Sequence, residues 1–111
     1  NWFRADADGR FLWPGFGDNL RVLEWIIKRR DGQVNAQKTP IGYVPLKEDI
    51  DLEVLQIDKK DMEELLKVDK SEWKSEVEDI KNFYDKFGTR MPAELLEELD
   101  ALKKRLEQPD N

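Results

Sequence analysis

The sequence contains neither cysteine nor histidine. Without Cys there can be no disulfide and no thiolate metal site. Without His there can be no Ser-His-Asp or Cys-His nucleophile pair, no His general base and no zinc site of the usual kind. An enzyme complete within these 111 residues would have to work with carboxylates, Lys, Arg and Tyr alone.

Long apolar runs and an excess of positive charge are also missing. No apolar run approaches the length of a membrane span, so we expect no membrane partner. The formal net charge is −6, and the charged residues, 40% of the chain, alternate in sign as on solvated helix faces. This acidic balance argues against nucleic acid as a partner. The absence of Cys fits a cytoplasmic protein.

The chain starts at Asn1, with no initiator Met and no signal-peptide pattern. We interpret this start as a cut through a longer protein, and a processed mature chain is the alternative. The length suits a single small domain, residues 1–111, with a modest core.

Residues 1–19 differ in composition from the rest of the chain. Two short strands are expected at 2–4 and 10–13, and the turn signal Asp6-Ala7-Asp8-Gly9 between them predicts a β-hairpin. The stretch 14–17 (Pro-Gly-Phe-Gly) cannot continue a strand and predicts an irregular loop. Five aromatic residues fall in this part: Trp2, Phe3, Phe11, Trp13 and Phe16.

Helical patterns occupy most of the chain beyond residue 18. Asp18 or Asn19 is expected to cap a helix at 19–32 that is apolar nearly all round, and Gly32 is expected to end it. Residues 58–108 predict further helices, capped by Asp58 and Asp69 and, for the last, opened by Pro92. The apolar stripes of the last two helices predict a helical hairpin. These stripes are Trp73, Val77, Ile80, Tyr84 and Phe87 on one helix, and Leu95, Leu99, Leu102 and Leu106 on the other.

The segment 33–57 lacks helical period and is expected to be an extended link. A long link without structure is unusual inside a compact domain. We therefore expect it to lie over a larger body that the sequence does not include. Together these patterns predict an α+β, mainly helical fragment, with an N-terminal β-hairpin and an aromatic Gly-rich loop followed by about four helices.

Two segments begin like a calcium-binding loop and a dinucleotide-binding loop, but neither completes its motif. The start of a calcium loop at Asp6 needs Gly at its sixth position and Glu at its twelfth, where the chain has Phe11 and Gly17. The third glycine of a dinucleotide fingerprint begun at Gly15 would fall on Leu20. No G-x-x-x-x-G-K-[ST] pattern occurs either. The sequence therefore offers no catalytic residue, no metal site and no phosphate-binding device.

The aromatic residues of the loop have two interpretations. Flat rings on neighbouring loops can hold a planar base between them, and the amide of Asn19 offers a donor and an acceptor to a base edge. Alternatively, Phe3, Phe11 and Phe16 form a small core under the loop, and Asn19 caps the helix. Composition alone favours the packing interpretation.

The order of residues in two segments changes that balance. Residues 1–4 (N-W-F-R), 9–19 (G-R-F-L-W-P-G-F-G-D-N) and 21–25 (R-V-L-E-W) resemble the GTP-dependent phosphoenolpyruvate carboxykinases. Residues 39–45 (T-P-I-G-Y-V-P) resemble a second segment of that family. The resemblance extends over the whole chain and is strongest in its first 45 residues. Asp18 stands where Glu is common, and Leu20 where Ser is common.

The resemblance implies that this is the C-terminal part of a larger α/β carboxykinase fold. It assigns the guanine of GTP or GDP to four residues: Phe3 and Phe16 enclose the ring, Phe11 lines the pocket, and Asn19 bonds the base edge. The family's gluconeogenic reaction converts oxaloacetate and GTP to phosphoenolpyruvate, GDP and CO₂. Its Mn²⁺, the Mg²⁺ that accompanies the nucleotide, and the phosphate-binding loop are held by residues upstream of this segment.

Three functions therefore stay open from the sequence. The first is an enzyme fragment that recognises guanine and is inactive by itself, with the rest of a monomeric parent chain as its partner. The second is a stand-alone helical interaction domain whose aromatic loop docks a protein. The third is a small adaptor that binds purines without chemistry.

Overall fold

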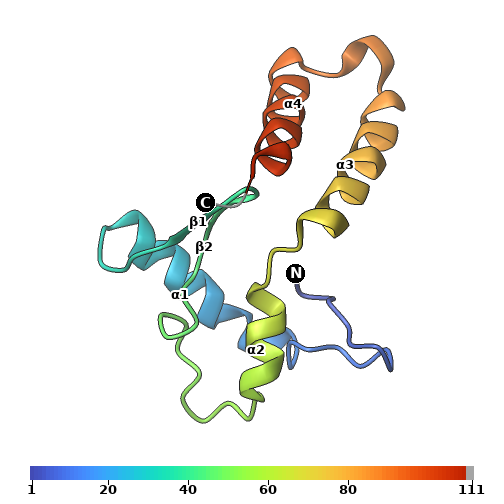
Figure 1. Cartoon of the computed structure of the whole chain (residues 1–111). Coiled ribbons are helices and arrows are strands. Elements are labelled where there is room, and N and C mark those ends of the chain that lie inside the picture. Colours follow the sequence, from blue (N-terminus) through green and yellow to red (C-terminus); the bar gives the residue numbers. More distant parts are fainter. Residues whose placement is uncertain (110–111) are drawn as a thin grey trace. The chain divides into compact units, whose positions relative to one another are not determined.

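The computed structural model describes residues 1–109, which are mainly helical (Figure 1). Between the first two helices lie two short strands joined by only two residues, a connection that only antiparallel strands can make. The elements in order are η1 (Phe16–Asp18), α1 (Asn19–Arg30), β1 (Gln37–Thr39), β2 (Gly42–Val44), α2 (Lys59–Leu66), α3 (Lys70–Asp85), η2 (Gly88–Arg90) and α4 (Ala93–Glu107).

The chain divides into two compact units. Unit 1 comprises Asn1–Lys38 and Tyr43–Lys67, and unit 2 comprises Thr39–Gly42 and the chain from Val68 on. No helix among residues 1–109 combines the length and the apolar character that crossing a bilayer requires.

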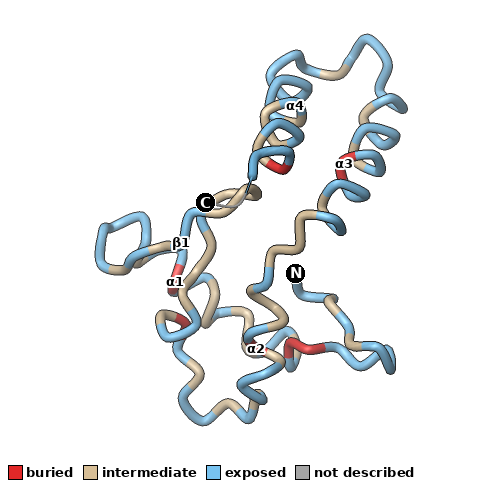
Figure 2. The backbone as a smooth tube through the Cα atoms, viewed as in Figure 1, coloured by how far each residue is buried: buried red, intermediate tan, exposed pale blue. Residues whose placement is uncertain are grey.

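Unit 1 is built around a small apolar core that draws on four separate segments. Trp13 comes from the N-terminal loop, Trp25 from α1, Ile50 from the segment between β2 and α2, and Met62 from α2. Buried positions appear as short red stretches of the tube in Figure 2. Partly buried apolar residues surround them, including Val22, Leu52 and Leu65. Since the segments are far apart in sequence, this core is what joins them into one unit.

Helix α1 buries only one of its faces. Trp25 is 7% exposed, whereas Leu20, Leu23 and Ile27 are 72%, 47% and 61% exposed. The apolar residues seen all round this helix in the sequence therefore have two different environments. One side packs in the core, and the other lies on the surface of the described residues.

The start of α1 differs from the prediction, whereas its end agrees with it. Neither Asp18 nor Asn19 caps the helix with its side chain, because η1 leads directly into α1 and the backbone N–H of Asn19 bonds to the carbonyl of Phe16. At the other end, Gly32 has a φ of 73°. The N–H of Gly32 bonds to Arg29 O and that of Gln33 to Lys28 O, at 3.2 and 2.8 Å, as in a Schellman motif.

The predicted N-terminal hairpin is reduced to one antiparallel bridge, between Ala5 and Phe11. Its turn forms as expected, because the Asp6 carboxylate accepts from the backbone N–H of Asp8 and of Arg10. The prediction of a strand at 2–4 is wrong. Asn1 Oδ1 accepts from the Phe3 N–H and the carbonyl of Asn1 from the Arg4 N–H, so these residues form a turn.

Part of the segment 33–57 is regular, since it includes β1 and β2. The Thr39 hydroxyl donates to the carbonyl of Gly42 at 2.7 Å, and the φ of 126° at Gly42 favours glycine there. The remainder is irregular, but it packs within unit 1, because Ile50, Leu52 and Leu55 contribute to the core of that unit. The sequence pattern predicted the extended character but not the hairpin or these core contacts.

Unit 2 contains the helical hairpin that the apolar stripes predicted, with α3 and α4 packed on each other. Val77 and Leu106 are 5% and 1% exposed, and mark its best-packed part. Phe87 and Leu95, nearer the connecting turn, are 46% and 43% exposed. Arg105 Nε also donates to the carbonyl of Pro40 at 2.7 Å, within the same unit.

The caps of α2 and α3 confirm the sequence prediction. Asp58 Oδ1 accepts from the Lys60 N–H at 3.0 Å. Asp69 Oδ1 accepts from the N–H groups of Ser71 and Glu72 at 2.8 and 3.2 Å. These carboxylates bond donors that have no partner inside the helix.

Replacing Asp69 with Ala should lower the free energy of unfolding by about 1 kcal/mol, because the first turn of α3 loses an acceptor for two N–H groups. Urea denaturation followed by circular dichroism measures the change. Asp79→Ala, on an exposed position of the same helix, is the matched control and should change stability by less than about 0.5 kcal/mol. Equal losses in both variants would contradict the capping role.

Candidate functional site

The candidate site lies on residues 1–19, which we call the aromatic loop. Two arginines tie it to α2 within unit 1. Arg4 Nη2 bonds Glu64 Oε1 at 2.7 Å, and Arg10 Nη2 bonds both carboxylate oxygens of Asp61 at 3.0 and 3.1 Å. These pairs join residues 60 and 51 positions apart and hold the loop against a helix much further along the chain.

A buried pair in the middle of the loop provides a second attachment. Leu12 and Trp13 are 4% and 6% exposed, and Trp13 belongs to the core. The Trp13 ring also packs against Trp2, with their centroids 6.0 Å apart. Because the loop is fixed at Trp13, the residues on either side of it are held to the surface of a packed unit.

The three phenylalanines predicted to contact a base are exposed. Phe3 is 74%, Phe11 59% and Phe16 91% exposed. Exposed large aromatic residues that gather on a loop favour a binding surface over a small core. The interpretation of these rings as internal packing is therefore disfavoured in the described residues.

The structure brings two of these three rings together. Phe3 and Phe11 meet edge to face, with centroids 6.2 Å apart and an interplanar angle of 65°. Phe16 follows on η1, and no aromatic pair within residues 1–109 includes its ring. The predicted partners Phe3 and Phe16 thus belong to the same loop without forming an aromatic pair.

Asn19 has a different role from the cap considered in the sequence analysis. Its Oδ1 accepts a hydrogen bond from Trp13 Nε1 at 2.9 Å. The side chain is half-buried, at the start of α1. Trp13 was not among the predicted site residues. Nothing in the sequence around them indicates a hydrogen bond between these two side chains, which are six positions apart.

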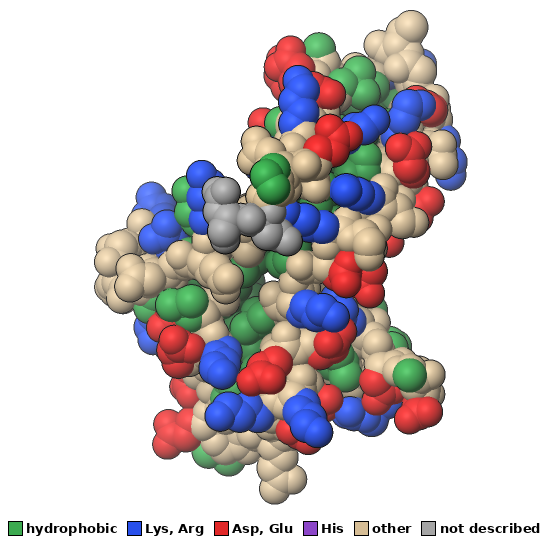
Figure 3. Space-filling view, in the orientation of Figure 1, with side chains coloured by type: hydrophobic (Ala, Val, Ile, Leu, Met, Phe, Trp, Pro, Cys, Tyr) green, Lys and Arg blue, Asp and Glu red, His purple; other side chains and the backbone are tan. Residues whose placement is uncertain are grey.

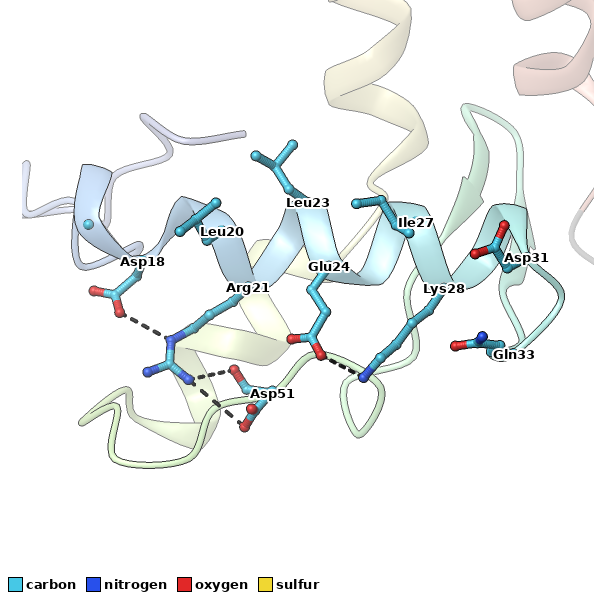
Figure 4. Close-up of a pocket in the computed structure, with 11 residues that line it drawn as sticks. Asp18, Leu20, Arg21, Leu23, Glu24, Ile27, Lys28, Asp31, Gln33 and Asp51 are labelled. Atoms are coloured by element: carbon cyan, nitrogen blue, oxygen red, sulfur yellow. Dashed lines mark hydrogen bonds and ion pairs between the residues drawn. The ribbon is translucent and has the colours of Figure 1, made fainter.

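A shallow pocket runs along α1 beside the loop (Figure 4). Its charged side chains pair with one another. Arg21 Nε bonds Asp18 Oδ1 at 3.1 Å, its Nη1 bonds the carbonyl of Asp51 at 2.9 Å, and Lys28 Nζ bonds Glu24 at 2.6 Å. The bond to Glu24 raises the pKa of Lys28 above its ordinary value. These cations are thus already neutralised by neighbouring acceptors.

The face of the molecule drawn in Figure 3 is mixed in charge. Lys, Arg, Asp and Glu alternate across the face drawn in Figure 3, with apolar side chains between them. Within residues 1–109, no group of three or more His, Cys, Asp or Glu could hold a metal ion. The described residues therefore do not fit the Mn²⁺ of the family's reaction, whose ligands the resemblance places upstream of this segment.

Comparison with known proteins identifies the chain. Residues 1–105 match the family model described as the phosphoenolpyruvate carboxykinase C-terminal P-loop domain. The chain belongs to this family.

Carboxykinases from several organisms are similar to this chain over nearly its whole length. Proteins named phosphoenolpyruvate carboxykinase [GTP] from Renibacterium salmoninarum and Neocallimastix frontalis are each 52% identical to this chain, and one from Thermoplasma volcanium is 48% identical. Each match covers 96% of this chain but only 17–18% of the relative. The chain therefore spans less than a fifth of the length of these carboxykinases.

The chain matches a domain named for its phosphate-binding loop but does not contain the motif of that loop. The family description names a P-loop, yet the G-x-x-x-x-G-K-[ST] pattern does not occur in this sequence. What this segment presents instead is an anchored loop with exposed aromatic rings and one oriented amide.

The surroundings of Asp6, in the turn of the aromatic loop, shift the pKa of its carboxylate. The pKa of Asp6 lies below its ordinary value of 3.8, first because the backbone N–H of Arg10 bonds the carboxylate, and also through the N–H of Asp8 and the Arg10 guanidinium. A lowered folded pKa means that the stabilising effect is complete above pH 3.8 and is lost as the pH falls through the lowered pKa.

Carbon-detected NMR should therefore give Asp6 a titration midpoint below 3.8. Arg10→Ala should raise this midpoint only in part, because it removes the guanidinium and leaves the backbone N–H, which is the largest cause. Arg30→Ala, an exposed arginine outside the loop, is the control and should leave the midpoint unchanged. A midpoint at or above 3.8 in the unsubstituted chain would contradict the bonded turn.

Proposed function

We propose that this chain is the C-terminal part of a GTP-dependent phosphoenolpyruvate carboxykinase and that its aromatic loop recognises the guanine of GTP and GDP. The parent enzyme would convert oxaloacetate and GTP to phosphoenolpyruvate, GDP and CO₂, a step of gluconeogenesis in the cytoplasm. The observation that carries the proposal is the exposure of three phenylalanines on a loop that is otherwise firmly anchored.

In this proposal the four loop residues divide the recognition of the base. Phe3 and Phe16 enclose the ring, and Phe11, already in contact with Phe3, lines the same pocket. Each stacked face contributes about 1–3 kcal/mol. Asn19 bonds the edge of the base and selects guanine over adenine. Binding would require Phe16 to turn its exposed ring toward Phe3, which its 91% exposure leaves it free to do.

The phosphates, metals and carbon chemistry belong to the remainder of the parent chain. Arg4 and Arg10 of the loop, and Arg21 beside it, are already paired with carboxylates, so the segment has little to offer a triphosphate. Mn²⁺, and Mg²⁺ with the nucleotide, would be held by residues outside this segment, and the isolated chain would be catalytically inactive. We propose that the parent is a monomer.

The exposed apolar face of α1 supports the same interpretation. Leu20, Leu23 and Ile27 lie along one side of the helix (Figure 4). We propose that the remainder of the parent chain covers them. A stand-alone interaction domain, the alternative function, is not favoured, since the relatives are carboxykinases more than five times as long.

The isolated chain should bind guanine nucleotides weakly, with a Kd on the order of millimolar or above. Stacking supplies only a few kcal/mol, and millimolar binding already requires about 4 kcal/mol. Titration with GTP followed by the fluorescence of Trp2 and Trp13 measures it, and tripolyphosphate is the control. An equal response to tripolyphosphate would contradict recognition of the base.

In the full-length enzyme, Phe16→Ala should raise the KM for GTP about tenfold and leave that for oxaloacetate nearly unchanged. The expected size comes from losing one stacked face, at about 1.4 kcal/mol per tenfold change. Phe83→Ala removes an exposed ring from α3 and serves as the matched control. A larger effect on oxaloacetate than on GTP would remove Phe16 from the base site.

A further inference from the structure

The hydrogen bond between Trp13 and Asn19 fixes which way the Asn19 amide faces. An indole Nε1–H can donate but cannot accept. The atom that it meets at 2.9 Å must therefore be the oxygen Oδ1 and not the nitrogen Nδ2. No acceptor within residues 1–109 takes the hydrogens of Nδ2, which leaves this group available to a ligand.

The orientation matters because an amide alone does not distinguish the two purines. The Watson–Crick edge of guanine presents an acceptor, O6, beside a donor, N1–H. Adenine presents the reverse, a donor at its 6-amino group and an acceptor at N1. Rotating an asparagine amide by half a turn exchanges its donor and acceptor, so a freely rotating side chain could bond either base equally well.

We propose that Trp13 is a specificity-determining positioning residue, which makes Asn19 selective for 6-oxopurines by holding its amide in one orientation. The inference rests on the proposed function of Asn19. With Oδ1 held by Trp13, Nδ2 donates to O6 of guanine, and the second lone pair of Oδ1 accepts from N1–H. Adenine would place its own donor against Nδ2.

The surroundings of Trp13 make the opposite orientation costly. A half turn of the amide would bring the Nδ2 hydrogens against the indole N–H, so that two donors would face each other. Trp13 is only 6% exposed, and little water can reach an unpaired indole N–H there. The ring itself cannot move aside easily, because it packs in the core and against Trp2.

The same core contains a natural comparison. Trp25 is also buried, at 7% exposed, and belongs to the same cluster. Its Nε1, however, has no hydrogen-bond partner among the described residues. Substituting Phe for either tryptophan removes an indole N–H and reduces the core by a similar volume. Only the change at Trp13 removes a bond to Asn19.

The experiment compares Trp13→Phe with Trp25→Phe in the full-length enzyme that carries this segment. The readout is the ratio of kcat/KM for GTP to that for ATP, with ITP as a third nucleotide. Trp13→Phe should lower the GTP-to-ATP ratio roughly five- to tenfold, the effect of losing one hydrogen bond. The ratio of GTP to ITP should stay unchanged, because both have O6 and N1–H. Trp25→Phe should alter neither ratio.

The possible results separate this inference from the function on which it rests. If Asn19→Ala abolishes the preference for GTP over ATP and Trp13→Phe leaves it intact, the orienting role of Trp13 is overturned and the role of Asn19 stands. If Asn19→Ala leaves the preference intact, the proposed role of Asn19 is itself wrong. If Trp25→Phe lowers the ratio as much as Trp13→Phe, core packing and not the hydrogen bond is responsible.

A second replacement covers the case in which Trp13→Phe does not fold. Incorporating 3-benzothienylalanine at position 13 preserves the shape of the indole and exchanges its N–H for sulfur, which cannot donate. The same loss of preference for GTP over ATP is expected. Full preference in this variant would overturn the proposal.

Discussion

The packing of Trp13 in the core of unit 1 is the constraint on which the candidate site depends. Its ring lies with Trp25, Ile50 and Met62, residues drawn from three other segments. Its indole nitrogen holds Asn19. One side chain thus connects the apolar interior with the polar group assigned to the base. The flanking phenylalanines can remain exposed without loosening the loop, because the loop is secured between them.

Charge serves mainly to attach the loop. Arg4 and Arg10 bond carboxylates of α2, and Arg21 of α1 bonds Asp18 of the loop. Such ion pairs contribute little stability where they are exposed, but they set the position of the loop relative to α2. A site of this composition suits a neutral, planar group better than a triphosphate. In the proposed enzyme, this composition would leave the phosphates to the remainder of the parent chain.

Local signals predicted the helices well. Asp58, Asp69 and Gly32 act within one turn of their own positions, so their effects can be inferred from neighbouring residues. Contacts between residues far apart in the chain could not be predicted from the sequence. At 2–4 the structure has a turn held by the Asn1 side chain in place of the predicted strand. The ion pair of Arg10 with Asp61 joins residues 51 positions apart.

The members of the candidate site stay a prediction, and their arrangement could not be inferred from the sequence. The resemblance named Phe3, Phe11, Phe16 and Asn19, and the exposure of the three rings is compatible with that role. The partnership of Asn19 with Trp13 could not be inferred from the pattern, because an Asn at the start of a helix ordinarily suggests a cap. Closing the site costs little chain entropy, since the contacts Phe3–Phe11, Ala5–Phe11 and Trp13–Asn19 join residues only six to eight positions apart. Transplanting residues 1–19 onto another scaffold would therefore demand first an apolar socket for Trp13, and only then space for the rings.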